Sequence, residues 1–143
     1  MGFTNFAHVG ITCKDPATIE RFYTKYFGFK RARFIPFGAE DQIVFLRSGN
    51  VYLELFKAKA DSPTLPPQND GHPCPGLRHL AFEVDNVDAK LAELRGAAKI
   101  TLGPLNFDDF IPGWRGVWIA DPEGNIVEIS QGYVDQNNPP PLL

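Results

Sequence analysis

The chain has 143 residues, of which 43% are hydrophobic and 22% charged, and its formal net charge at pH 7 is -3. This length and composition predict one globular domain, residues 1–143, and exclude a disordered chain. The small negative charge excludes a broad positive surface for nucleic acid or anionic membranes, so a small molecule is the expected partner. Two cysteines, no secretory leader and no membrane-length apolar run predict a reduced, cytoplasmic protein without a membrane partner.

The first half of the chain predicts a strand, a helix and three further strands. The apolar run His8-Val9-Gly10-Ile11 begins the first strand. Asp15 and Pro16 are a typical N-cap and first helical residue, and Gly28 is a typical C-cap, so we expect a helix between them. Three strands are then expected, over residues 29–35, 42–47 and 51–56.

The second half repeats this order of elements. We expect a strand over 77–84, a helix over about 86–95 that ends at Gly96, and strands near 98–102, 115–120 and 125–130. The two halves define modules of approximately residues 3–56 and 77–131, joined by a Pro-rich linker, 57–76. This linker and the loop 103–113 are the segments where we expect substrate selectivity to lie.

Four ionisable residues occupy matching places in the two halves: His8, Glu54, His79 and Glu128. An offset of about 71 residues lays His8 on His79, and one of about 74 lays Glu54 on Glu128. Each residue alone has an ordinary explanation, as a hydrogen-bonded core histidine or a solvated glutamate. The match favours a shared cause, because a buried imidazole or carboxylate is unfavourable unless it is paired or bound to a metal. Two imidazoles and two carboxylates suit a divalent Ni, Co, Zn, Mn or Fe ion.

The residues around these four positions resemble the vicinal oxygen chelate superfamily, which includes glyoxalase I, extradiol dioxygenases and bleomycin resistance proteins. The segments that carry the resemblance are His8-Val9-Gly10-Ile11, Tyr52-Leu53-Glu54-Leu55, Arg78-His79-Leu80-Ala81-Phe82-Glu83-Val84 and Ala120-Asp121-Pro122-Glu123-Gly124-Asn125. The resemblance implies an α+β fold in which two βαβββ modules form a cup-shaped mixed sheet around a metal, with the helices outside.

The order His-Glu-His-Glu is similar to that of bacterial glyoxalase I, a lactoylglutathione lyase. This implies a metal-dependent lyase or isomerase that acts through an enediolate on a small substrate with vicinal oxygens, with Glu54 and Glu128 as candidate bases. It also implies a homodimer whose site takes ligands from two chains. Thr12 and Ala58 stand where bacterial glyoxalase I has the Arg and Asn that hold glutathione, which argues against glutathione as the thiol carrier.

Two other functions remain open at this point: an Fe(II) extradiol-type dioxygenase, and a non-catalytic protein that binds a drug or metabolite. Arg78 and Arg115 are candidates for binding a substrate carboxylate, although exposed solubilising charge explains either one more simply. His72, in the Pro-rich linker, is expected to be solvated. The expected substrate pocket is formed by Thr12, Tyr52, Phe107, Phe110, Trp114 and Trp118.

Overall fold

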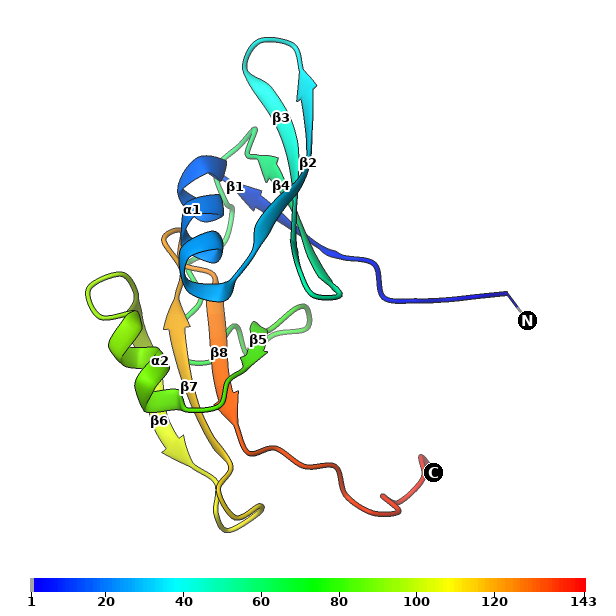
Figure 1. Ribbon diagram of the computed structural model, residues 1–143, viewed down its shortest axis with the longest axis vertical. Helices are drawn as coiled ribbons and strands as arrows, with labels where there is room; N and C mark the ends of the chain where they lie inside the picture. The colour runs from blue at the N-terminus through cyan, green and yellow to red at the C-terminus, as the bar shows by residue number, and fades with distance from the viewer. Residues whose placement is uncertain (1) are drawn as a thin grey trace. The chain divides into compact units, whose positions relative to one another are not determined.

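The computed structural model describes residues 2–143, and Met1, the first residue of the predicted domain, lies outside the described residues. The chain forms two compact units, Met1–Leu65 and Pro66–Leu143 (Figure 1). Each predicted module falls within one of these units. Among the described residues, no helix is long and apolar enough to cross a membrane.

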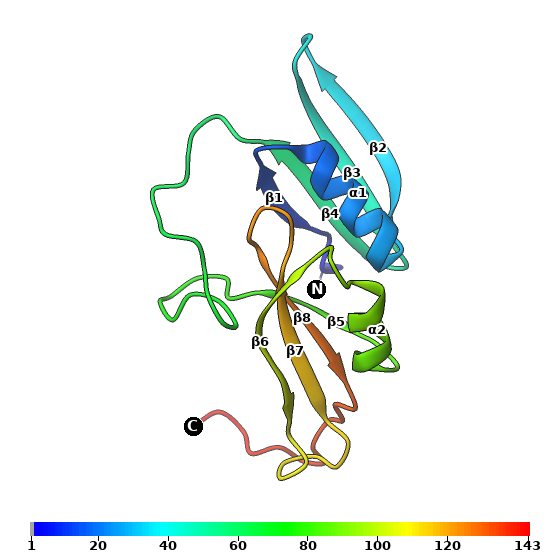
Figure 2. The same cartoon turned by 90° about the vertical axis from the view of Figure 1, so that its left-hand side faces the viewer.

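The first unit is a four-stranded sheet with one helix. Its strands lie in the order β1-β4-β3-β2, with β1 parallel to β4 and the other neighbours antiparallel. The helix packs against β1 and β4, on one face of the sheet (Figure 2). The elements in chain order are β1 (Val9–Cys13), α1 (Pro16–Phe27), β2 (Lys30–Phe37), β3 (Asp41–Ser48) and β4 (Val51–Lys57).

The second unit has the same plan. Its strands lie in the order β5-β8-β7-β6, again with only the first pair parallel, and its helix packs against β7 and β8. The predicted α+β class and the βαβββ order of both modules are confirmed. The elements are β5 (Leu80–Glu83), α2 (Val87–Glu93), β6 (Lys99–Asn106), β7 (Arg115–Ala120) and β8 (Ile126–Gln131).

The caps predicted for α1 are confirmed. The Asp15 carboxylate accepts the Thr18 N–H at 3.3 Å, and Pro16 is the first helical residue. Gly28 ends the helix with φ +72°, a left-handed conformation that glycine adopts readily, and its N–H donates to the Tyr23 carbonyl. Local chemistry therefore sets both ends of this helix.

Several predicted boundaries were wrong, including the start of β1, which is Val9, and the end of β2, which is Phe37. Tertiary pairing explains the largest error. Strand β6 continues to Asn106, inside the predicted loop, because Leu105 and Asn106 pair with Gly116 and Arg115 of β7. Helix α2 ends at Glu93, where 3₁₀-type hydrogen bonds tighten the chain before Gly96. Strand β5 begins at Leu80, so His79 comes directly before the strand instead of inside it.

Side chains in each sheet alternate between a face covered by the helix and a face turned away from it, which we call the far face. The far face carries Glu54 in the first unit and Glu128 in the second, in register with Gly10 and Ala81. The helix-covered faces form the two cores. Buried sheet residues there are Ile11, Cys13, Val44, Leu46, Leu53 and Leu55 in the first unit, and Val117, Ile119, Val127 and Ile129 in the second.

The turn between β7 and β8 is held by a buried carboxylate. Asp121, only 4% exposed, accepts hydrogen bonds from the backbone N–H groups of Glu123 and Asn125 at 2.9 and 3.0 Å. It also accepts one from the Asn125 side-chain amide at 2.8 Å. These bonds satisfy the buried charge and confirm the turn that the sequence predicts between Asp121 and Asn125.

Candidate functional site

In the first unit, the far face brings His8 and Glu54 together. His8 directly precedes β1, and Glu54 lies in the middle of the neighbouring β4. The imidazole Nε2 is 2.7 Å from Glu54 Oε2, with the side chains 40% and 15% exposed. Phe45, which pairs with Glu54 across β3 and β4, meets the His8 ring edge-on at a centroid distance of 5.7 Å. The carboxylate is thus mostly shielded and faces an imidazole nitrogen.

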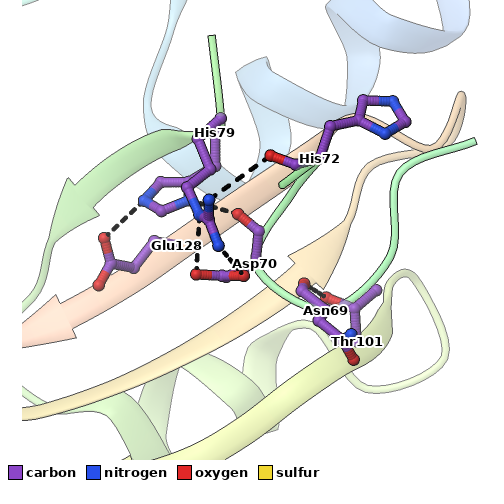
Figure 3. Close-up of polar contacts among 7 residues, drawn as sticks. Asn69, Asp70, His72, His79, Thr101 and Glu128 are labelled. Carbon is purple, nitrogen blue, oxygen red and sulfur yellow. Dashed lines mark hydrogen bonds and ion pairs between the residues drawn. The ribbon is translucent and has the colours of Figure 1, made fainter. Parts of the chain in front are cut away.

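The second unit contains an equivalent pair. His79 directly precedes β5, Glu128 lies in the neighbouring β8, and His79 Nε2 is 3.1 Å from Glu128 Oε2 (Figure 3). These side chains are 19% and 17% exposed. Trp118, which pairs with Glu128 across β7 and β8, meets the His79 ring at 6.2 Å. Each unit therefore presents one imidazole Nε2 beside one carboxylate, as the repeat in the sequence suggests.

A short loop segment, residues 69–72, fixes the orientation of His79, and we call it the strap (Figure 3). The Asp70 carbonyl lies 2.6 Å from His79 Nδ1. The Asp70 carboxylate accepts two hydrogen bonds from the Arg78 guanidinium, both at 3.0 Å, and the Thr101 hydroxyl donates to the Asn69 carbonyl at 2.6 Å. The bonds from Arg78 lower the pKa of the Asp70 carboxyl from its ordinary value, so this ion pair is present at neutral pH.

The strap also fixes which His79 nitrogen carries a proton. A carbonyl oxygen can only accept, so the contact with Asp70 requires a proton on Nδ1. In a neutral ring, Nε2 then carries a lone pair and no proton, and it faces the Glu128 carboxylate, which is also an acceptor. Two such groups attract one another only when a proton or a metal ion lies between them. A histidine that donates Nδ1–H to a carbonyl and points Nε2 outward has the usual arrangement of a metal ligand.

The donor types of both pairs fit a divalent metal ion. Imidazole nitrogen and carboxylate oxygen are ligands for Ni, Co, Zn, Mn and Fe ions. Within each unit, no third histidine, cysteine, aspartate or glutamate of residues 2–143 joins the pair. Each unit by itself therefore offers two ligands, half of the predicted set of four.

The predicted pocket residues of the second unit lie partly together. The Phe107 ring is 4.7 Å from the Trp114 ring and 6.4 Å from the Trp118 ring. A side chain at Gly116 would contact Glu128, Phe107 and Trp118, so the glycine leaves space between the aromatic groups and the carboxylate. Phe110 is 77% exposed.

The remaining predicted pocket residues lie in the first unit. Thr12 is exposed on the far face of β1, and Tyr52 lies on the far face of β4 beside Arg47.

The two candidates for binding a substrate carboxylate, Arg78 and Arg115, each pair with a carboxylate of the chain itself. Arg78 already holds Asp70, and Arg115 donates to the Asp88 carboxylate at 2.7 Å. The His72 carbonyl is 3.5 Å from an Arg78 nitrogen, and the His72 ring points away from the His79–Glu128 pair (Figure 3). Sequence analysis missed the strap, since its main contact to His79 is a backbone carbonyl, which every residue type has.

Gly71→Ala should displace the strap. A Cβ at Gly71 would collide with the Arg78 carbonyl, and the φ of +122° disfavours any side chain. We expect the free energy of unfolding to fall by about 3 kcal/mol. We also expect the NMR signal of the His79 Nδ1 proton to be lost through exchange with water. Gly76→Ala is the matched control, because Gly76 also has positive φ but open space around it, and there we expect a loss of only about 1 kcal/mol. Equal effects of both variants would contradict a role for the strap.

A protein-family model described as the Glyoxalase/Bleomycin resistance protein/Dioxygenase superfamily matches residues 5–129. The chain belongs to this superfamily. The resemblance inferred from the sequence is thereby confirmed, and members of the superfamily are often metal-dependent enzymes.

Individual relatives agree with this assignment. The uncharacterized protein YaeR of Escherichia coli (strain K12) is 29% identical over 133 residues, which are 90% of this chain and 97% of YaeR. The crystal structure of a glyoxalase family protein from Enterococcus faecalis has 29% identity and a TM-score of 0.66, covering 91% of this chain and 99% of that one. The fosfomycin resistance protein FosX from Listeria monocytogenes, complexed with Mn(II) and sulfate, has 12% identity and a TM-score of 0.65, covering 93% and 96%. The likeness to FosX shows the fold alone.

Proposed function

We propose that the protein is a metal-dependent lyase or isomerase that acts on a small substrate with two adjacent oxygens. The main support is the His79 geometry: the Asp70 carbonyl holds Nδ1–H and leaves Nε2 beside the Glu128 carboxylate. His8 and Glu54 repeat this Nε2–carboxylate contact. In the proposal, the two pairs together supply four ligands to one Ni, Co, Zn, Mn or Fe ion and leave positions open for substrate oxygens.

The two glutamates are the proposed proton carriers. A bound divalent ion would supply Lewis-acid stabilisation of the negative charge that develops on adjacent substrate oxygens. Glu54 or Glu128 would remove a proton from one of the two carbons that carry these oxygens and return it to the other. Both carboxylates are mostly shielded from water and already contact an imidazole, so they are held in place for this transfer.

Proton transfer without dioxygen separates this proposal from its rivals. Nickel-, cobalt- or zinc-loaded protein should incorporate solvent deuterium into a hemithioacetal of methylglyoxal with a small thiol, or into an α-hydroxy ketone, under anaerobic conditions. Glu54→Gln and Glu128→Gln should each lower this rate at least about a hundredfold. Oxygen-dependent ring opening of a catechol by the Fe(II)-loaded protein, without deuterium incorporation, would favour the dioxygenase. Tight ligand binding without any turnover would favour a binding protein.

The glutathione hemithioacetal of methylglyoxal should be a poor substrate, with kcat/KM below about 10⁴ M⁻¹s⁻¹. Thr12 and Ala58 provide no charged or amide donor for a glutathione carboxylate, and each such hydrogen bond contributes on the order of 1.5–3 kcal/mol. Steady-state kinetics of the metal-loaded protein provides the measurement. The double variant Thr12→Arg, Ala58→Asn should raise kcat/KM for this substrate. Wild-type kcat/KM at or above that limit would show that glutathione is held by other residues.

A further inference from the structure

A pocket of about 690 Å³ lies beside His8 in the first unit. This volume is in the range of small-molecule sites. Its lining includes the metal-ligand candidate His8, the three aromatic residues Phe6, Phe45 and Tyr52, and one cation, Arg47.

The cation, Arg47, lies on the same face of the sheet as Glu54. Val44 and Leu46 of β3 are buried in the core of the first unit, so Phe45 and Arg47, which alternate with them, belong to the far face. Phe45 pairs with Glu54, and Arg47 pairs with Tyr52, one step further along the same two strands. The Cα atoms of alternate strand residues are about 7 Å apart. A small molecule can therefore reach from the His8–Glu54 pair to Arg47.

The Arg47 guanidinium is oriented but not neutralised. Its Nε donates to the Gly49 carbonyl at 2.7 Å, and its carbon lies 5.3 Å from the centre of the Tyr52 ring. Among residues 2–143, the structure gives its two terminal nitrogens no hydrogen bond and no ion pair. Three other arginines, by contrast, each pair with a carboxylate: Arg31 with Glu20, Arg78 with Asp70 and Arg115 with Asp88.

We propose that Arg47 binds a carboxylate of the substrate and thereby selects acidic molecules that also carry two adjacent oxygens. A guanidinium fixed through Nε and a ring face presents its remaining donors as a fork, which matches the two oxygens of a carboxylate. A single arginine balances one negative charge, which favours a carboxylate over a phosphate dianion. The inference rests on the proposed function, because the adjacent oxygens are assigned to the metal ion.

Hydroxamates provide the test, because they offer two adjacent oxygens to a metal ion whatever tail they carry. The cobalt-loaded protein would be titrated by calorimetry with the monohydroxamates of succinic, glutaric and adipic acid and with the methyl ester of each. Acetohydroxamate serves as the probe without a tail. In the wild type, at least one acid should bind about tenfold more tightly than its ester, as expected for one charge-assisted hydrogen-bonded pair. In Arg47→Gln, the ratio of the two affinities should fall to about one.

Two arginines serve as controls. Arg21 lies on α1, where its side chain donates to the Thr18 hydroxyl, and Arg21→Gln should keep the tenfold ratio. Arg33 pairs with Phe45 from β2 but does not line the pocket, and Arg33→Gln should also keep it. If the wild type binds acetohydroxamate but binds acids and esters equally, the proposed role of Arg47 is overturned, while the proposed metal function is not. Loss of the ratio in Arg33→Gln but not in Arg47→Gln would overturn the assignment. Failure of acetohydroxamate itself to bind would overturn the metal function and this inference with it.

Discussion

Replacing His79 with alanine should abolish stoichiometric binding of a divalent ion. The variant removes the nitrogen that the strap holds beside Glu128, and losing one of four proposed ligands should weaken binding at least about a hundredfold. His8→Ala should have the same effect through the other pair. Elemental analysis after dialysis against nickel, cobalt, manganese or zinc, or anaerobic ferrous iron, measures the outcome. The wild type should retain about one ion per chain.

The third histidine of the chain provides the control for this experiment. His72 is the last residue of the strap, but its ring points away from the His79–Glu128 pair (Figure 3). His72→Ala should therefore bind as much metal as the wild type. A wild type that stays free of metal with every ion, or a His79→Ala variant that keeps its full complement, would rule out the proposed centre.

A mixed dimer of one His8→Ala chain and one His79→Ala chain should bind one ion, although neither parent protein binds any. The expectation follows from the proposal that the protein is a homodimer in which one chain's N-terminal pair acts with its partner's C-terminal pair. Each variant then still has one intact pair. A two-fold dimer combines these into one complete site and one doubly damaged site.

Two different affinity tags would allow the mixed dimer to be purified, and elemental analysis with light scattering would measure ions per dimer. Mixing two wild-type chains with the same tags should give two ions per dimer. A verified mixed dimer without metal would show that the pairs act within one chain. A wild-type monomer at micromolar concentration would rule out the homodimer as well.

The sequence predicts the fold well where local chemistry decides the structure. The ends of α1 follow from Asp15, Pro16 and Gly28, whose preferences depend on their own backbone positions. Strand β6 differs because Gly103 and Pro104 are typical loop residues, yet the chain beyond them pairs with β7. Such pairing depends on contacts between residues that are far apart in the sequence, and a local sequence pattern does not show these contacts.

The candidate site divides in the same way. The pairs His8–Glu54 and His79–Glu128 could be proposed because the repeat marks both residues of each pair with an unusual side chain. The contact of the Asp70 carbonyl with His79 could not be predicted, because every residue type has a backbone carbonyl. Arg47 was also overlooked, since its importance depends on the register of β3 against β4 and on which other arginines already hold carboxylates.

The Asp121 turn has a consequence for the direction in which Glu128 points. Trp118 and Glu128 face each other because β7 and β8 are aligned by the turn that Asp121 holds. A slip of β8 by one residue would bring Val127 or Ile129 to the far face and press the carboxylate into the core beneath α2. The direction of the Glu128 side chain therefore depends on Asp121 at the tip of the β7–β8 hairpin, a residue that has no part in the proposed chemistry.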